Sequence, residues 1–218
     1  MPPSAPRGKA RRAYRSPRRT AQAQRTRERI LAAATDLFAA NGYATTTIRA
    51  VAAAAGVSVP AVELAFGTKA QLLKTAIDIA IAGDDAPVPV LDRDWAAQAR
   101  AAPDAGEFLA AVGRVVRPAM SRSAGLVLAV FEAAPTDADM QDLADRLGAQ
   151  RATTVAWIVD GLRQHAALRA GLTRRHAIDQ VWLLMDPTVY QRLTRYRGWR
   201  PAQYERWLVD SIARLLLD

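Results

Sequence analysis

Apolar residues recur at helical spacing along most of the chain from about residue 26. The first such segment ends at Asn41 and Gly42, a pair that favours the left-handed conformation found at helix C-termini. Its apolar face is formed by Ile30, Leu31, Ala34, Leu37 and Phe38. A repeat of three to four residues is typical of an amphipathic helix. No stretch alternates apolar and polar residues as a half-buried strand does, so we expect an all-α fold.

The next apolar positions predict a short helix that ends at Gly56. Glycine adopts left-handed backbone without steric cost, so it can end a helix and start a tight turn. Three consecutive threonines precede this helix, and each has a hydroxyl oxygen that can accept a free N–H group at its first turn. Thr46 is the preferred cap, and the other two candidates are Thr45 and Thr47.

A second short helix is predicted from Val59 to about Ala65. Ser58 can cap it, and Pro60 falls in its first turn, where the missing N–H group is no loss. Two short helices joined by a tight turn predict a helix-turn-helix, a unit that lays its second helix in the DNA major groove.

The rest of the pattern predicts further helices on both sides of a proline- and aspartate-containing boundary at residues 83–94. Expected helices span about 69–82, 104–119, 122–134, 135–167, 173–185, a short segment from 187, and 201–217. The helix from 135 is expected to start with a capping box of Thr136 and Asp139. We therefore divide the chain into an arm (1–20), a helix-turn-helix domain with a linking fourth helix (21–82), and a larger helical domain (83–218).

Charge is concentrated at the N-terminus. The chain carries a formal net charge of +9, yet residues 1–29 hold ten arginines and lysines against the single acid Glu28, which leaves a neutral body. A basic, proline-containing block repels itself and suits a polyanion. We expect residues 1–20 to be disordered when alone and to contact DNA; the alternative is a solvated tail that aids solubility.

Several classes of protein are disfavoured by what the sequence lacks. The 218 residues contain no cysteine, which excludes disulfides and thiolate metal sites. No apolar run approaches the roughly 18 residues of a membrane span, and no signal peptide is evident, so we expect a cytoplasmic protein. The only histidines, His165 and His176, make a poor metal set. No catalytic motif or cofactor loop stands out, so we expect neither an enzyme nor a cofactor.

Residues 26–82 resemble the DNA-binding domain of the TetR family of bacterial transcriptional regulators. The resemblance rests on many short matches in the right order: residues 29–34, Leu37-Phe38, Asn41-Gly42-Tyr43, Thr46-Thr47-Ile48, Val51-Ala52, Ala55-Gly56-Val57-Ser58, Phe66, Lys69 and Leu72-Leu73. It implies a three-helix DNA-binding domain followed by a larger helical domain for ligand binding and dimerisation. It also implies a homodimer on a palindromic operator, most simply a repressor, released from DNA by a small-molecule effector that the sequence does not identify.

The resemblance also implies roles for individual residues. Thr46 and Thr47 match positions that touch phosphate, and Lys69 matches a phosphate-contacting lysine, although helix capping and simple solvation are the plainer interpretations. The second helix departs from the family pattern, because Glu63 stands where a phosphate-gripping tyrosine is common. The candidate DNA-binding residues are Thr45, Thr46, Thr47, Ser58, Val59, Pro60, Ala61, Glu63, Leu64 and Lys69.

This unusual surface keeps a second hypothesis open. An apolar helix can contact thymine methyl groups and Glu63 can accept from a cytosine amino group, but Glu63 equally repels phosphate. The alternative is a helical ligand sensor or partner-binding dimer that has lost specific DNA binding. A small helical enzyme is a third, less favoured interpretation. In the second domain we expect residues 173–185 and 201–217 to form the dimer contact, with Trp182 and Leu208 in it, and Trp157 is a candidate pocket residue.

Overall fold

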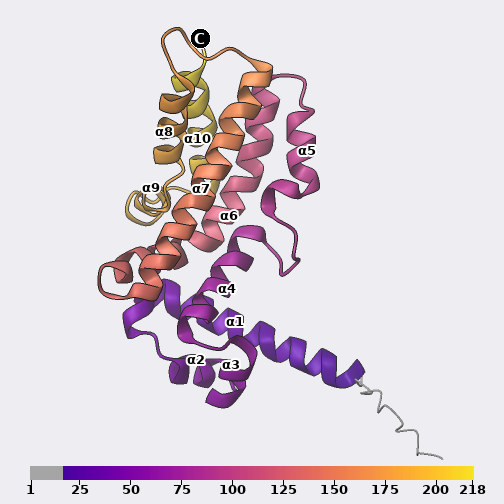
Figure 1. Ribbon diagram of the computed structural model, residues 1–218, viewed down its shortest axis with the longest axis vertical. Coiled ribbons are helices and arrows are strands. Elements are labelled where there is room, and N and C mark those ends of the chain that lie inside the picture. The colour runs from indigo at the N-terminus through magenta and orange to yellow at the C-terminus, as the bar shows by residue number, and fades with distance from the viewer. Residues whose placement is uncertain (1–16) are drawn as a thin grey trace, which may run out of the picture.

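The computed structural model describes residues 17–218, which form ten α-helices joined by short connections (Figure 1). No strand occurs in this part of the chain, so the all-α prediction is confirmed. The helices are α1 (Pro17–Thr45), α2 (Ile48–Ala55), α3 (Val59–Phe66), α4 (Lys69–Ala82), α5 (Asp94–Arg100), α6 (Ala105–Ala133), α7 (Ala138–His165), α8 (Arg174–Leu184), α9 (Pro187–Gln191) and α10 (Pro201–Leu216). Shorter segments are the 3₁₀ turns η1 (Val90–Asp92) and η2 (Ala134–Thr136) and the π-helical η3 (Arg192–Tyr196).

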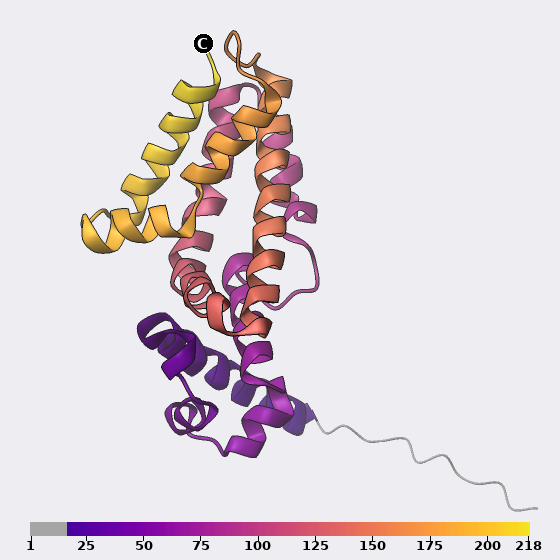
Figure 2. The ribbon, with the colours of Figure 1, turned by 60° about the vertical axis from the view of Figure 1, so that its left-hand side comes forward.

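The molecule has two ends that are linked by long helices (Figures 1 and 2). The short helices α2 and α3 lie at one end, and the C-terminus lies at the other. Helix α6 is the central element, since it packs against α1, α4, α5, α7, α9 and α10. None of the helices between residues 17 and 218 is by itself long and apolar enough to cross a membrane; only α2 and α3, bent by 104°, meet that length and composition when counted together.

Two hydrophobic clusters hold the described helices together. The first contains the buried faces of α1 to α4 and continues into the end of α6 and the start of α7, where Leu126, Val130 and Met140 are fully buried. The second fills the opposite end around Phe108, Ile158 and the buried faces of α8 and α10. The helix-turn-helix therefore shares one core with residues 126–147 of the following part of the chain.

The predicted helices are largely confirmed, with corrections at their starts. Helix α1 begins at Pro17 rather than Thr26, because alanine and glutamine in residues 21–24 favour a helix even without an apolar face. Four of the twenty residues predicted to be disordered are thus helical, and residues 1–16 lie outside the described part. At the other end Gly42 leaves the helix with φ of 76° and ψ of 178°; the positive φ agrees with the prediction, but the ψ is not that of the left-handed helical conformation.

The larger errors concern α5, α6 and α7. Helix α5 was not predicted, because its seven residues bury only two alanines and a partly exposed Trp95. The two helices expected from 104 to 134 are one helix, α6, which continues through Pro118 because its neighbours hold it on both sides. The capping box at the start of α7 is wrong: Asp137, in extended backbone, accepts from the Met140 N–H group.

Candidate nucleic-acid interface and internal cavity

The turn between α2 and α3 has the geometry that the sequence predicts. Gly56 is left-handed, with φ of 64° and ψ of 42°, and its N–H group donates back to the end of α2. Ser58 is extended and accepts from the Ala61 N–H group at 3.3 Å, so it caps α3. Val62 and Phe66 are buried against the first cluster and fix α3 on the domain. The opposite face of α3 is exposed, as it must be if this helix is to enter a groove of DNA.

The three threonines before α2 have different roles. Thr47 is the N-cap and accepts from the Ala50 N–H group at 3.1 Å, which corrects the preference for Thr46. Thr46 is 2% exposed, and its hydroxyl lies 2.8 Å from the Gly42 carbonyl and 3.2 Å from that of Leu37. Thr45 is exposed and donates to the Asn41 carbonyl. Because Thr46 is buried and bonded inside, it holds the α1–α2 connection and is not available to a phosphate.

Lys69 is also held by the protein. Its Nζ atom donates to the Tyr43 carbonyl at 3.0 Å and lies 3.9 Å from the centroid of the Tyr43 ring. The pKa of the Lys69 ammonium is lowered overall, because burial lowers it by more than the Asp137 carboxylate at the start of α7 raises it. Burial, with Asp137 and then Asp139, raises the pKa of Tyr43. Lys69 therefore joins α4 to the end of α1, so a phosphate contact needs this bond to be shared or released.

The exposed face of α3 is apolar with one acid. Leu64 is 91% exposed, and Glu63 and Pro60 are exposed beside it. Val59 and Ala61 are partly buried. No ion pair involving Glu63 is formed with a described residue, so its carboxylate is a single negative charge on the surface that would face DNA.

Cations near this surface come from other helices, and the sequence alone did not assign them individually. Arg49 is exposed on α2, next to the N-terminus of that helix. Arg29 on α1 approaches the turn, with Nη1 3.9 Å from where a side chain on Gly56 would begin. The predicted arm residues up to position 16 lie outside the described part of the chain. A positive neighbour of the turn was predictable only as part of the basic N-terminal block, because its placement depends on how α1 packs.

A cavity of about 680 Å³ lies in the middle of the molecule. Its walls are the second half of α4, the segment 84–91, and facing parts of α6 and α7, with Met185 and Pro187 at one side. Most of the lining is apolar, as is usual for small-molecule sites. Trp95 contributes to this wall and donates its ring N–H to the Val90 carbonyl at 2.8 Å. Trp157, the predicted pocket residue, instead packs behind it at a ring distance of 5.2 Å.

The cavity wall is bonded to both ends of the helix-turn-helix domain. Arg93 pairs with Asp84 at 2.8 Å and donates to the Ala82 carbonyl at the end of α4. Arg27 on α1 pairs with Asp85 of the wall, donates to the Ala65 carbonyl at the end of α3, and stacks over the Phe66 ring at 4.4 Å. The segment 84–91 is therefore connected to the end of α4 through Arg93 and to the end of α3 through Arg27.

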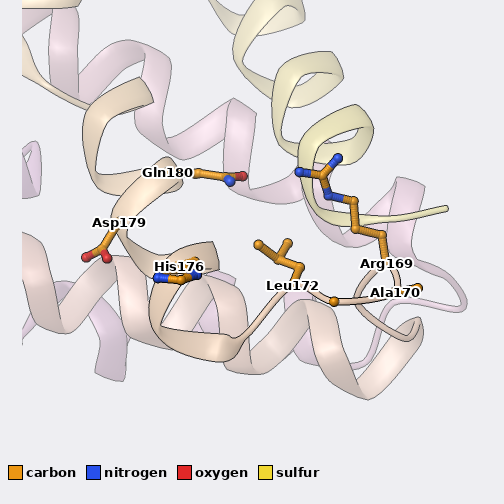
Figure 3. A pocket seen from close by; sticks show the side chains of 7 residues that line it. Arg169, Ala170, Leu172, His176, Asp179 and Gln180 are labelled. Atoms are coloured by element: carbon orange, nitrogen blue, oxygen red, sulfur yellow. The ribbon is translucent and has the colours of Figure 1, made fainter.

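A second, open recess of about 470 Å³ lies at the turn between α7 and α8 (Figure 3). Arg169 and Leu172 belong to this turn, and His176, Asp179 and Gln180 project from α8 (Figure 3). His165, the other histidine, packs against Phe108 at a ring distance of 5.3 Å. Among residues 17–218 no three histidine and acidic side chains have the spacing of a metal site.

The helices predicted to form a dimer contact, α8 and α10, lie side by side (Figure 2). Leu208 is 1% exposed inside the protomer, so the prediction that it reaches a partner is wrong. Trp182 is partly buried under Arg151, whose guanidinium carbon lies 3.8 Å from the ring centroid. The exposed apolar side chains on this face are Leu183, at 60%, and Leu215, at 36%.

Comparison with known proteins agrees with the geometry of the N-terminal unit. Residues 30–76 match the family model of bacterial regulatory proteins, tetR family. This segment includes α2, the turn at Gly56 and α3, so the family model covers the whole helix-turn-helix. No curated protein sequence matches the chain.

Solved structures share the fold over most of the chain. A transcriptional regulator from Saccharomonospora viridis, in complex with choline, has 20% identity and a TM-score of 0.66 over 89% of this chain and 99% of that one. FadR from Bacillus subtilis, in complex with stearoyl-CoA, has 18% identity and a TM-score of 0.64 over 86% and 98%. NalD of Pseudomonas aeruginosa, the secondary repressor of a multidrug efflux pump, has 20% identity and a TM-score of 0.61 over 89% and 97%. The family and these structures are those of transcriptional regulators, not of enzymes.

Proposed function

We propose that this chain is a transcriptional regulator of the TetR family that binds a palindromic operator as a homodimer and leaves it when a small molecule enters the cavity. The family match and the ligand complexes among the similar structures support a ligand-responsive DNA-binding regulator. Repression, a cytoplasmic site of action and the absence of catalysis are further parts of the proposal. The observation that carries it is that α4 starts at the helix-turn-helix and ends in the wall of a cavity suited to a small molecule.

Release follows from this connection. Ile79, Ile81 and Ala82 of α4 line the cavity, while its first residue, Lys69, is bonded to Tyr43 beside α2. A ligand that spreads the walls shifts α4 and the pair of Arg27 with Asp85, and thereby changes the angle of α3 in each protomer. A dimer reads two half-sites about 34–36 Å apart, so a change in that angle prevents both helices from fitting successive grooves.

The DNA contacts that we propose are divided between two parts of the chain. Thr47, Thr45, Ser58 and the start of α2 lie on the surface that would meet phosphate, and Arg49 adds a cation there. Pro60, Leu64 and Glu63, with the partly buried Val59 and Ala61, form the surface that would enter the groove. The basic arm, whose first sixteen residues lie outside the described part, supplies much of the affinity in this proposal.

The alternative function is a ligand sensor without specific DNA binding. It is favoured by one observation: of the phosphate contacts implied by the family, Thr46 is buried and Lys69 is bonded to Tyr43. Fluorescence anisotropy with DNA from upstream of the protein's own gene, at stated salt, separates the two. Specific binding that survives an excess of unrelated duplex supports the regulator. Equal binding to both duplexes supports the alternative.

A further inference from the structure

The charges that line the cavity are already paired within the protein, and this restricts the ligand. Three aspartates line the cavity near the end of α4, and each forms an ion pair. The pairs are Asp78 with Lys74 at 2.5 Å, Asp84 with Arg93 at 2.8 Å, and Asp85 with Arg27 at 3.2 Å. The carboxylates are about half exposed, which places them at the rim. All three are therefore neutralised before a ligand arrives.

The only cation among the described residues of the lining is Arg151; one of its terminal nitrogens is paired, while its buried Nε atom has no hydrogen-bond partner among the described residues. Its Nη1 atom lies 2.7 Å from Asp186 Oδ2, and the two side chains are 12% and 18% exposed. The Arg151 guanidinium also packs over the Trp182 ring. The other carboxylate oxygen of Asp186 accepts from the Thr188 N–H group at 2.7 Å and caps α9. Asp186 lies just behind the lining and neutralises Arg151, the group that would otherwise attract a ligand anion.

The remaining polar groups in the wall are mainly acceptors. Ser123 donates its hydroxyl proton to the Ala119 carbonyl, and Thr153 and Thr154 donate theirs to carbonyls one turn back. Their oxygens can still accept a hydrogen bond but have no proton left to donate. A carboxylate or phosphate group, which only accepts, finds no donor on these three hydroxyls and would depend on Gln150 or on the Nε atom of Arg151.

We infer that the cavity selects an uncharged lipophilic molecule that can donate a hydrogen bond, and that Asp186 excludes anionic lipophiles from it. The inference rests on the proposed function in so far as the cavity is the effector site. Breaking the Arg151–Asp186 pair to seat an anion would leave the Asp186 carboxylate buried without its partner, which is costly. A cation would have to displace the arginines or the lysine from the rim.

The test compares three probes with the same ten-carbon chain: 1-decanol, kept below its solubility limit, and decanoate and decyltrimethylammonium, each kept below its micelle concentration. Binding to the full-length protein without DNA is measured by isothermal titration calorimetry, with tryptophan fluorescence, to which Trp95 in the wall contributes, as a second readout. We expect decanol to bind about tenfold or more tightly than either charged probe. Equal affinity for decanoate or for the ammonium probe, or no binding of decanol, overturns the inference.

The variant Asp186→Asn makes the test specific to this residue. Asparagine is an equally good helix cap, so α9 is retained while the charge that neutralises Arg151 is lost. The expected result is a gain of decanoate affinity of about tenfold with decanol little changed. Asp160→Asn is the matched control, since it removes an α7 carboxylate that pairs with Arg174 outside the cavity. If both variants leave the decanoate-to-decanol ratio unchanged, Asp186 does not set selectivity.

Arg151→Gln provides a second check, because it removes the cation and must not gain decanoate binding even if Asp186 is freed. Circular dichroism confirms that each variant is folded before titration. The probes are titrated without DNA, so this test fails independently of the proposed function. Decanol that binds but does not release the operator contradicts the proposed effector role and leaves the ligand class intact.

Discussion

Arg27 on α1 and Asp85 in the cavity wall are 58 positions apart in the sequence and form an ion pair of 3.2 Å. The same guanidinium donates to the Ala65 carbonyl at 3.3 Å and covers the Phe66 ring at 4.4 Å. One side chain thus touches both the wall of the cavity and the end of α3. With side chains 29% and 52% exposed, the pair itself is worth about 1 kcal/mol or less. Its importance is in what it connects.

Asp85→Asn is expected to loosen the wall and the end of α3 together. Hydrogen–deuterium exchange should rise several-fold in peptides covering residues 84–91 and 63–66, because local opening no longer breaks the ion pair. The unfolding midpoint should change little. Asp92→Asn, at the end of η1 just after this segment, is the control, because the Asp92 carboxylate forms no hydrogen bond or ion pair with a described residue. Exchange confined to 84–91 would mean that Arg27 does not couple the two regions.

Glu63→Gln tests the acid on the reading surface. Removal of a negative charge that faces phosphate should raise affinity for unrelated DNA by about two- to tenfold at low salt, and should reduce any preference for cytosine. Anisotropy titrations at two salt concentrations measure both effects. Asp210→Asn removes an exposed charge on α10, far from α3, and should change neither. A loss of affinity in Glu63→Gln would instead show that the carboxylate reads a base.

Deletion of residues 1–19 removes seven arginines and lysines: Arg7, Lys9, Arg11, Arg12, Arg15, Arg18 and Arg19. Operator binding should weaken, and the slope of log affinity against log salt should flatten by roughly 0.9 for each phosphate that the arm no longer neutralises. A full-length variant with these seven residues changed to glutamine should behave in the same way. Unchanged affinity and slope in the truncated protein would exclude the arm from DNA binding.

Thr46→Val is expected to destabilise the protein rather than only its complex with DNA. The hydroxyl is buried and bonded to the Gly42 carbonyl, so its removal leaves an unpaired acceptor and costs about 1–3 kcal/mol. Urea unfolding followed by circular dichroism measures this. Thr45→Val, at an exposed neighbour, should cost less. A variant of Thr46 that keeps full stability but loses DNA affinity would restore the phosphate role that its sequence position suggests.

Leu183→Glu is expected to disrupt the proposed dimer. Leu183 is 60% exposed on α8, next to α10. A charge there would lose its water if α8 and α10 of one chain packed against the same two helices of a second chain. Multi-angle light scattering should report monomers of about half the wild-type mass. Leu64→Glu, equally apolar and more exposed but on α3, should stay dimeric. Leu208 is unsuitable, since it is buried and its substitution tests folding. A dimer that persists in Leu183→Glu places the contact elsewhere.

The elements that the sequence predicted well are those with strong local signals. Gly56 and Ser58 determine the turn by their own backbone and side-chain preferences, and Asp186 with Pro187 starts α9 as expected. The break predicted between residues 119 and 122 does not occur, because packing on several sides keeps α6 continuous past Pro118. Helix α5 has too few apolar residues to produce a detectable period.

The candidate site was predictable only where its contacts join residues that are close together in the sequence. The caps of α2 and α3 depend on residues within four positions of each other. Thr46, by contrast, is buried by the way α1 ends, and Lys69 is captured by Tyr43, 26 residues away. The cavity and the pairs Arg27–Asp85 and Arg151–Asp186 bring together distant segments, and a single sequence carries no signal for such contacts.

The hydrophobic cluster shared by α1–α4 and residues 126–147 limits how this protein can be recombined with others. A chimaera joined at the loop after α4 would leave Leu126, Val130 and Met140 behind and expose the surface that they cover on the helix-turn-helix. The smallest part that could be transferred with an intact helix-turn-helix core is therefore discontinuous in sequence: residues 17–82 together with the end of α6 and the start of α7. Exchange of the rest of the chain for that of another protein is expected to succeed when the junctions lie within α6 before Leu126 and within α7 after Leu147. A single junction at position 83 is expected to give insoluble protein.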